Sequence, residues 1–244
     1  MSRKNIIKKQ RKSTILKKVL FIFFLCIACF FILTSELFSV ETVMVENNTM
    51  FSQEDIEKMS GITLGINTFK IKTNDISQRI KDNPYIKNVQ VKRKLPDGIA
   101  ISIEERKEAA SVFFLDQCVV LDEEGYVLST AESNPYLTII DGLKIKDFSI
   151  GEKLKIENQE VLDEVLNVII KMNDYELFFK KIIIEDQQLN VAIYDKLFCK
   201  ANSDMLINNM QMLGEIIYDL HKKGIKRGII RVGGDGYFSY SPTD

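Results

Sequence analysis

The longest apolar run of the chain lies near its N-terminus. Val19 to Leu33 is continuously apolar, and no charged residue occurs between Lys18 and Glu36. A membrane-spanning helix needs about 20 apolar residues, so this run is at the short end unless the two apolar residues before Lys17 extend it. A cleaved signal peptide is the alternative, but no A-x-A-like site follows and the basic tail is long for a secretory leader. We therefore predict an uncleaved transmembrane helix over residues 19–36.

Residues 40–75 begin with a β pattern that gives way to a helix. Val43 and Val45 alternate with polar neighbours, which predicts a strand. Ser52 then precedes polar and acidic residues, as expected of a helix N-cap followed by acids in the first turn. Ile56 and Met59 give this helix an apolar side.

A second helix and two strands complete this region. The helix is predicted around Ile76 and Ile80, with Thr73 or Asn74 as its N-cap, and it should end at Asn83-Pro84 because the residue before proline avoids the α region. The strands are predicted from alternating apolar residues on either side of the turn Leu95-Pro96-Asp97-Gly98, namely Val89, Val91, Ile99, Ile101 and Ile103. We expect a β-α-α-β-β unit in which both helices cover one apolar sheet face.

Residues 107–244 predict a second domain that is rich in strands. Short strands are expected over residues 112–115, 118–121 and 136–140, with a hairpin turn at Asp122-Glu123-Glu124-Gly125. An amphipathic helix follows, and then a hairpin over residues 182–184 and 189–194. The helix is indicated by apolar residues spaced three and four apart: Val161, Leu162, Val165, Leu166, Ile169 and Met172.

A longer helix and a hairpin are predicted at the C-terminal end. Ser203 or Asp204 should cap the helix and Gly224 should end it. Its predicted buried stripe consists of Leu206, Met210, Leu213, Ile217 and Leu220. The hairpin joins Ile229, Ile230 and Val232 to Tyr237–Tyr240 through the turn Gly233-Gly234-Asp235-Gly236.

Charge fixes the expected orientation of the anchor. Residues 1–18 carry eight basic side chains and no acidic one, which leaves 25 basic and 34 acidic residues in the remainder, a net charge of −9. Positive charge before a span keeps that end in the cytoplasm, so residues 1–18 should form a cytoplasmic tail and residues from about 37 onward should lie outside. An external part with this acidic excess is a poor candidate for nucleic-acid binding, which requires a basic face.

The sequence contains no pattern typical of catalysis or cofactor binding. No G-x-S-x-G, P-loop or His/Cys metal spacing is present, and the only histidine, His221, lies at the end of the longer helix. A calcium loop at Asp122 is the alternative to a hairpin turn, but Ser133 stands where such a loop needs a bidentate glutamate. We expect no enzymatic activity, cofactor, metal or small-molecule substrate.

The four cysteines do not indicate a redox site. Cys26 and Cys29 lie one helical turn apart in the apolar run, without the βαβ context of a redox motif. Cys118 and Cys199 occur in strand-like apolar runs, where buried free thiols are more common than a disulfide.

Three stretches of the first domain resemble the POTRA domain of the FtsQ/DivIB family of bacterial cell-division proteins. They are VETVMVENN, ITLGINTFKI and DNPYIKNVQVKRKLPDGIAISIEER. The resemblance rests on the ordered set of G-x-N before an aromatic, N-P-Y-I, V-x-R-x-L-P and a closing E-R. This chain departs from the family at Lys107-Glu108-Ala109, where proline and alanine usually follow E-R. The resemblance implies a POTRA domain over residues 37–106.

The second domain resembles the β domain of the same family. The similarity lies in the aspartate-glycine hairpin, the P-Y-L-x-x-I-x-G segment and a final aromatic before proline at Tyr240-Ser241-Pro242. The resemblance implies an FtsQ/DivIB-type β domain over residues 107–244. The whole chain is thus expected to be α+β, with one transmembrane helix and two external domains.

The resemblance implies a non-catalytic scaffold of the division machinery. Such a protein helps to recruit, assemble and stabilise the septal complex with FtsL and FtsB (DivIC in Gram-positive bacteria), links it to the septal peptidoglycan synthases and concentrates at the division septum. An open sheet edge can add a strand from a partner. The candidate edge residues are Ile230, Arg231, Val232, Tyr237, Phe238 and Tyr240, each of which has the alternative of only filling its own core.

Two other functions are compatible with parts of the sequence. A POTRA-bearing membrane assembly or translocation protein would need many amphipathic membrane strands, whereas the C-terminal half predicts two helices. A membrane-tethered enzyme acting on the cell wall would need a catalytic pattern, and turnover of peptidoglycan by the external part would be its signature.

Overall fold

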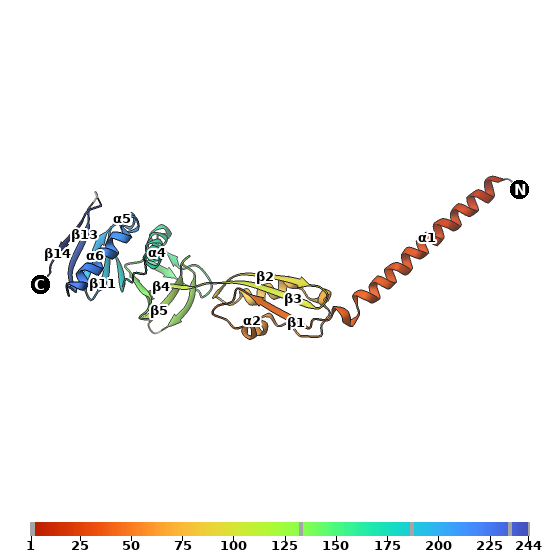
Figure 1. Ribbon diagram of the computed structural model, residues 1–244, viewed down its shortest axis with the longest axis horizontal. Helices are drawn as coiled ribbons and strands as arrows, with labels where there is room; N and C mark the ends of the chain where they lie inside the picture. Colours follow the sequence, from red (N-terminus) through yellow and green to blue (C-terminus); the bar gives the residue numbers. More distant parts are fainter. Residues whose placement is uncertain (1–2, 132–133, 186–187, 234–235, 244) are drawn as a thin grey trace. The chain divides into compact units, whose positions relative to one another are not determined.

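The computed structural model describes residues 3–131, 134–185, 188–233 and 236–243, with side chains from Leu16 onward (Figure 1). The chain divides into two compact units. Unit 1 consists of Met1–Asp82 and Ile86–Glu105, and unit 2 consists of Asn83–Tyr85 and Arg106–Asp244. The two predicted turn residues Gly234 and Asp235, as well as Ser133, lie outside the described residues.

Unit 1 begins with one long helix, α1 (Arg3–Leu33). Its segment Leu16–Leu33 is long and apolar enough to cross a membrane, and none of this segment is buried inside the protein. The helix ends three residues before the predicted end of the span, because the hydroxyl groups of Thr34 and Ser35 donate to carbonyls of the last turn, Phe30 O at 2.8 Å and Ile32 O at 2.6 Å. A short 3-10 helix, η1 (Glu36–Phe38), follows.

The rest of unit 1 has the predicted β-α-α-β-β order. Strands β1 (Thr42–Glu46), β2 (Ile86–Lys94) and β3 (Gly98–Glu105) form a sheet in the order β1-β3-β2, in which β1 is parallel and β2 antiparallel to β3. Helices α2 (Gln53–Ser60) and α3 (Thr73–Lys81) pack against it. The core is built mainly from isoleucines: Val40, Ile56, Ile71, Ile76, Ile80, Ile86, Ile99, Ile101 and Ile103.

Of the two helix N-caps predicted in unit 1, that of α2 is confirmed and that of α3 is wrong. Ser52 caps α2, and its side chain and that of Asp55 form a reciprocal capping box, which confirms the predicted cap. The predicted cap of α3 is wrong, since the N-cap is Lys72 and Thr73 is already helical. Lys72 makes no side-chain cap, and the predicted inward residues Ile76 and Ile80 are buried.

The carboxylate of Glu105, at the end of β3, holds the loop that follows β1. It accepts hydrogen bonds from the backbone N–H groups of Thr49, Met50 and Phe51 at 2.8–3.1 Å, and from the Thr49 hydroxyl. Burial by itself would raise the pKa of Glu105, but these hydrogen bonds outweigh burial and hold the pKa below its ordinary value. The ionised carboxylate therefore stabilises this loop.

Unit 2 contains one large mixed sheet covered by helices. The sheet has nine strands in the order β14-β13-β12-β11-β10-β7-β4-β5-β6, and β8 (Ile145–Asp147) and β9 (Lys155–Ile156) form a separate pair. The sheet strands are β4 (Glu108–Phe114), β5 (Gln117–Asp122), β6 (Val127–Ala131), β7 (Thr138–Asp141), β10 (Lys181–Glu185), β11 (Gln188–Tyr194), β12 (Lys196–Ala201), β13 (Arg227–Val232) and β14 (Phe238–Ser241).

Three helices and the sheet of unit 2 share one apolar core. The helices are α4 (Gln159–Asp174), α5 (Ser203–Asn208) and α6 (Met210–Lys222), and Figure 1 shows α5 and α6 beside β11 and β13. All but one of the α4 residues predicted to be apolar and inward are buried, the exception being Val161 at the rim. The predicted stripe of the C-terminal helix is buried throughout.

The predicted single C-terminal helix is two helices in the structure. Its N-cap is Asn202, whose side chain accepts from Met205 N at 2.9 Å, so the predicted cap at Ser203 or Asp204 is wrong. Asn209 separates α5 from α6, with φ −117° and a side-chain amide that donates to the Met205 carbonyl at 2.9 Å. Asparagine competes in this way for backbone groups that a continuous helix would use.

The two cysteines of unit 2 are free and buried. Cys118 lies in β5 and Cys199 in β12, both within the core of unit 2 or beside it. Burial raises the pKa of Cys199 to about 12. A thiol with this pKa stays protonated and unreactive at neutral pH.

Replacing Glu105 with glutamine tests how its carboxylate holds the loop. We expect Glu105→Gln to lower the free energy of unfolding of unit 1 at neutral pH by about 1 kcal/mol, because charge-assisted hydrogen bonds become neutral ones. Since the folded pKa of Glu105 is lowered, its contribution is present above the unfolded pKa and is lost as the pH falls through the folded value. The difference between wild type and variant should therefore shrink on acidification, which denaturant titrations at several pH values would measure.

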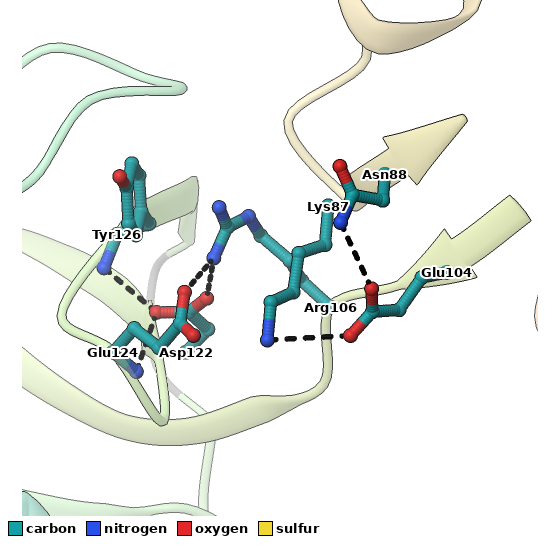
Figure 2. Close-up of polar contacts among 7 residues, drawn as sticks. All are labelled: Lys87, Asn88, Glu104, Arg106, Asp122, Glu124 and Tyr126. Atoms are coloured by element: carbon teal, nitrogen blue, oxygen red, sulfur yellow. Dashed lines mark hydrogen bonds and ion pairs between the residues drawn. The ribbon is translucent and has the colours of Figure 1, made fainter. Parts of the chain in front are cut away.

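The neighbouring Glu104→Gln is the matched control. Its carboxylate faces the half-buried Lys87 and the exposed Asn88 (Figure 2), and an ion pair this close to the surface contributes about 0–1 kcal/mol. An unfolding curve for Glu105→Gln that coincides with that of Glu104→Gln at neutral pH would contradict the proposed role of Glu105.

Candidate partner-binding site

An open sheet has two edges, and in unit 2 these are β6 and β14. Backbone N–H and C=O groups on the outer side of an edge strand have no partner in the sheet and can accept a strand from another chain. The two edges differ in what else lies on them.

The start of the β6 edge is occupied by the chain itself. Val127 donates its N–H to the carbonyl of Glu152 at 2.9 Å, and its own carbonyl accepts from Gly151 at 2.8 Å. Further along β6, the Ser129 hydroxyl accepts from the hydroxyl of Tyr85 at 3.0 Å. An incoming strand would have to displace these contacts.

The β14 edge is paired on its inner side only, among the residues that the structure describes. β14 is antiparallel to β13, with Phe238 opposite Val232 and Tyr240 opposite Ile230. Gly233 donates to the carbonyl of Tyr237 at 2.8 Å, which makes these two residues a hydrogen-bonded pair. Because such pairs alternate along an antiparallel ladder, the backbone N–H and C=O groups of Phe238 and Tyr240 point outward.

The six residues predicted as edge candidates fall into two groups. Ile230 and Val232 are buried in the core of unit 2, and Arg231 between them is exposed, with its guanidinium 3.3 Å from the Ser241 hydroxyl. All three lie in β13, which is an internal strand between β12 and β14. The other three form the edge itself: Tyr237 is 76% exposed, whereas Phe238 and Tyr240 are half-buried against the core. Partner binding at these residues stays a prediction.

Gly228 positions Tyr240 and was not recognised from the sequence. Gly228 has φ +130°, and a Cβ at this position would lie 2.5 Å from the Tyr240 ring and 2.8 Å from the Ser241 carbonyl oxygen. The ring can therefore lie over the glycine while its hydroxyl donates to the Arg227 carbonyl at 2.8 Å. These contacts fasten the end of β14 to β13 without using the outward backbone groups.

The first strands of unit 2 are fastened by a charged cluster around Arg106 (Figure 2). Its guanidinium donates to the carboxylates of Asp122 and Glu124 and lies 3.8 Å from the centre of the Tyr126 ring. Burial by itself would lower the pKa of Arg106, but the two acidic partners outweigh burial and raise it. The arginine therefore stays charged in its partly buried position.

Asp122 uses its oxygens within the predicted hairpin turn. Besides Arg106, it accepts from the backbone N–H groups of Glu124 at 2.9 Å and Tyr126 at 2.7 Å, and it is only 3% exposed. Donors that occupy a carboxylate in this way hold a turn and leave little room for a cation. The described residues include no group of three or more His, Cys, Asp or Glu side chains that could hold a metal ion.

His221 lies in a groove of about 840 Å³ at the end of α6. The groove also borders the β11–β12 turn and the segment after α4, and an ion pair between Lys180 and Asp195 lies in its wall. The Nδ1 atom of His221 is 3.5 Å from the hydroxyl of Tyr194, and the histidine is exposed. This arrangement fits the predicted position of His221 at the end of the helix.

A substitution at Gly228 tests the packing of the edge. Gly228→Ala should lower the free energy of unfolding of unit 2 by about 2 kcal/mol or more, because the new methyl group meets the Tyr240 ring in addition to the cost of positive φ. Gly224→Ala is the matched control, since Gly224 has φ +70° but no atom within 4 Å of the added Cβ, and should cost about 1 kcal/mol. Equal losses of stability in thermal unfolding would contradict the role of Gly228.

Comparison with known proteins gives matches to a domain family and to bacterial cell division proteins. Residues 38–106 match the family model of the POTRA domain, FtsQ-type. The cell division protein DivIB of Clostridium tetani is 35% identical over 122 residues, which are 48% of this chain and 45% of that protein. DivIB of Clostridium botulinum (strain Hall) is 27% identical over 237 residues, 94% of this chain and 92% of that protein. FtsQ of Syntrophotalea carbinolica is 30% identical over 157 residues, 62% and 54% of the two chains.

A solved structure of the major extracytoplasmic domain of DivIB from Geobacillus stearothermophilus covers 49% of this chain and 97% of its own, with 14% identity and a TM-score of 0.32. That score is too low to support a comparison of the folds. The sequence matches and the FtsQ-type POTRA segment confirm the resemblance found from the motifs. Residues 38–106 therefore form an FtsQ-type POTRA domain, and the chain as a whole is similar to the DivIB and FtsQ cell division proteins.

Proposed function

We propose that this chain is a non-catalytic scaffold that helps to recruit, assemble and stabilise the septal division complex. Residues 1–18 would form a cytoplasmic tail and residues 19–36 the membrane anchor. Residues 37–106 would form an external POTRA domain and residues 107–244 an external β domain. The proposed partners are FtsL and FtsB or DivIC, and through them the septal peptidoglycan synthases, with the protein concentrated at the division septum.

The observation that carries this proposal is the contrast between the two edges of the sheet in unit 2. The chain occupies the start of one edge, at Val127, with its own backbone, whereas β14 is paired on its inner side only, among the described residues. A scaffold with no chemistry of its own needs surfaces that hold partners, and a strand edge provides backbone hydrogen bonds for that purpose.

We propose that a partner segment adds to β14 as an extra strand. Phe238 and Tyr240 would supply two N–H donors and two C=O acceptors, and the half-buried side chains would give the added strand an apolar surface to pack on. Each new hydrogen bond contributes about 0.5–1.5 kcal/mol, so four of them together with side-chain packing support a specific complex. Four residues is a short edge, which limits pairing with unintended strands.

Two substitutions at position 238 separate the contribution of the backbone N–H to partner binding from that of the phenyl group. Phe238→Pro removes both the outward N–H and the phenyl group, whereas Phe238→Ala removes only the phenyl group. If a partner adds to β14, the proline variant should capture partners from membranes at least tenfold less well than the alanine variant, which corresponds to about 1.4 kcal/mol. The measurement is co-purification with tagged full-length protein, followed by identification of the captured chains.

Three results would count against the proposal. Equal capture by Phe238→Pro and Phe238→Ala would exclude strand addition at β14, provided that both variants unfold at the same temperature. Capture by the wild-type chain that contains neither an FtsL-like nor a DivIC-like protein would exclude the proposed partners. Turnover of peptidoglycan by the purified full-length chain would contradict a non-catalytic role.

A further inference from the structure

Unit 1 exposes five large apolar side chains in the segments around the exit of α1. They are Leu37 (61% exposed), Leu64 (61%), Ile66 (41%), Phe69 (44%) and Leu95 (57%), and we call them the juxtamembrane surface. Single exposed apolar residues are ordinary, but a group of this kind marks an interaction surface.

The juxtamembrane surface is carried by three segments, residues 36–38, 64–69 and 95–96, and hydrogen bonds hold them together. The buried hydroxyl of Thr68 lies 2.7 Å from the carbonyl oxygen of Phe38 and 3.3 Å from that of Pro96. The rings of Phe38 and Phe69 lie 5.2 Å apart, and Val40 donates its N–H to the Ile66 carbonyl at 2.9 Å. The five apolar residues therefore belong to one end of unit 1 and are not scattered over it.

The same end is tied to the last turn of α1. The side-chain amide of Asn67 donates to the carbonyl of Leu33 at 2.8 Å. Phe38 is the fifth residue after Leu33, and a chain of five residues reaches at most about 18 Å even when fully extended. Three of these residues form the more compact η1, which shortens the reach further. When α1 spans a bilayer, the juxtamembrane surface must lie at the depth of the outer headgroups or directly above them.

We infer that the juxtamembrane surface inserts its apolar side chains into the outer headgroup layer of the bilayer that holds α1. This inference rests on the proposed membrane anchor. Apolar side chains gain free energy at the boundary between headgroups and acyl chains, and the short tether removes most of the entropic cost of bringing them there. The contact would hold the POTRA unit down on the membrane in addition to its covalent link.

The charges around this surface are mixed, which predicts a particular lipid dependence. Lys70 and Lys72 are exposed in the same loops, but Glu36 and Glu41 are exposed beside the exit of α1. Attraction to anionic headgroups therefore has little net basis here. Insertion should occur in zwitterionic phosphatidylcholine as well as in bilayers that contain phosphatidylglycerol.

The absence of tryptophan from the sequence permits a direct test in the full-length chain. A single tryptophan introduced as Leu64→Trp or Phe69→Trp reports the depth of the juxtamembrane surface through quenching by spin-labelled phosphatidylcholine in reconstituted vesicles. Met50→Trp is the matched control. Met50 is 54% exposed in the same unit, but it is bonded to Glu105 at the far end of β3, about 23 Å from Gly98 along the strand.

We expect blue-shifted, quenched tryptophan emission from Leu64→Trp and Phe69→Trp. A spin label near the headgroup should quench it more strongly than a label deep in the bilayer. The control Met50→Trp should show red-shifted, unquenched emission. Emission from Leu64→Trp and Phe69→Trp that matches Met50→Trp would overturn the inference. Phe24→Trp, within α1, distinguishes failure of this inference from failure of the proposed membrane anchor. If deep labels quench Phe24→Trp while Leu64→Trp stays unquenched, only the inference fails, and if Phe24→Trp is unquenched, the proposed membrane anchor fails too.

Discussion

The nine-stranded sheet of unit 2 does not close, so its two outer strands keep backbone donors and acceptors that no neighbouring strand can use. The chain meets this constraint differently at its two edges. At the start of β6, the carbonyl of Glu152 and the N–H of Gly151 bind the backbone of Val127, and the Tyr85 hydroxyl binds the side chain of Ser129. At β14, the strand is held by contacts of the Tyr240 side chain with Gly228 and Arg227 of the neighbouring β13. These contacts do not use the outward backbone groups of β14. Among the described residues no strand pairs with the outward groups of Phe238 and Tyr240, and the proposed function depends on them.

Two adjacent residues fasten the two units internally. Glu105 binds the backbone of the loop after β1 in unit 1, whereas Arg106 binds Asp122 and Glu124 in unit 2. Each charge is thus paired within its own unit. A pair of side chains at the point where one unit ends and the next begins therefore gives each unit a firm boundary. Glu105 and Arg106 are the closing E-R of the motifs by which the sequence resembles the FtsQ/DivIB proteins.

Local pattern was enough to predict most elements and much of the core. Ile76 and Ile80, spaced four apart, and the alternating Ile99, Ile101 and Ile103 are all buried, because a single face of each element meets the core. The Ser52 cap was predicted from its own side-chain chemistry. Features that depend on one residue and its near neighbours in the chain can be read in this way.

Features that depend on distant pairing could not be predicted in the same way. Ile230 and Val232 alternate as an edge strand would, but the parallel strand β12, from residues 196–201, lies beside them and makes β13 internal. The need for glycine at position 228 depends on a contact with Tyr240 that the pattern does not contain. The break at Asn209 is local, since its side chain bonds the carbonyl of Met205, but the apolar stripe continues across it and so did not indicate it. The edge was therefore predicted in the right hairpin, but its two strands were not distinguished.

The central claim is that this chain contributes to division by being held through its β14 edge. Its most direct test is the position of full-length fluorescent fusions in dividing cells that lack the native copy. The account predicts that the wild-type fusion gathers at the septum and that Phe238→Pro, at equal abundance, is spread evenly over the membrane, while Phe238→Ala retains septal enrichment. A wild-type fusion that never gathers at the septum, or a Phe238→Pro fusion that gathers there as well as wild type, would contradict it.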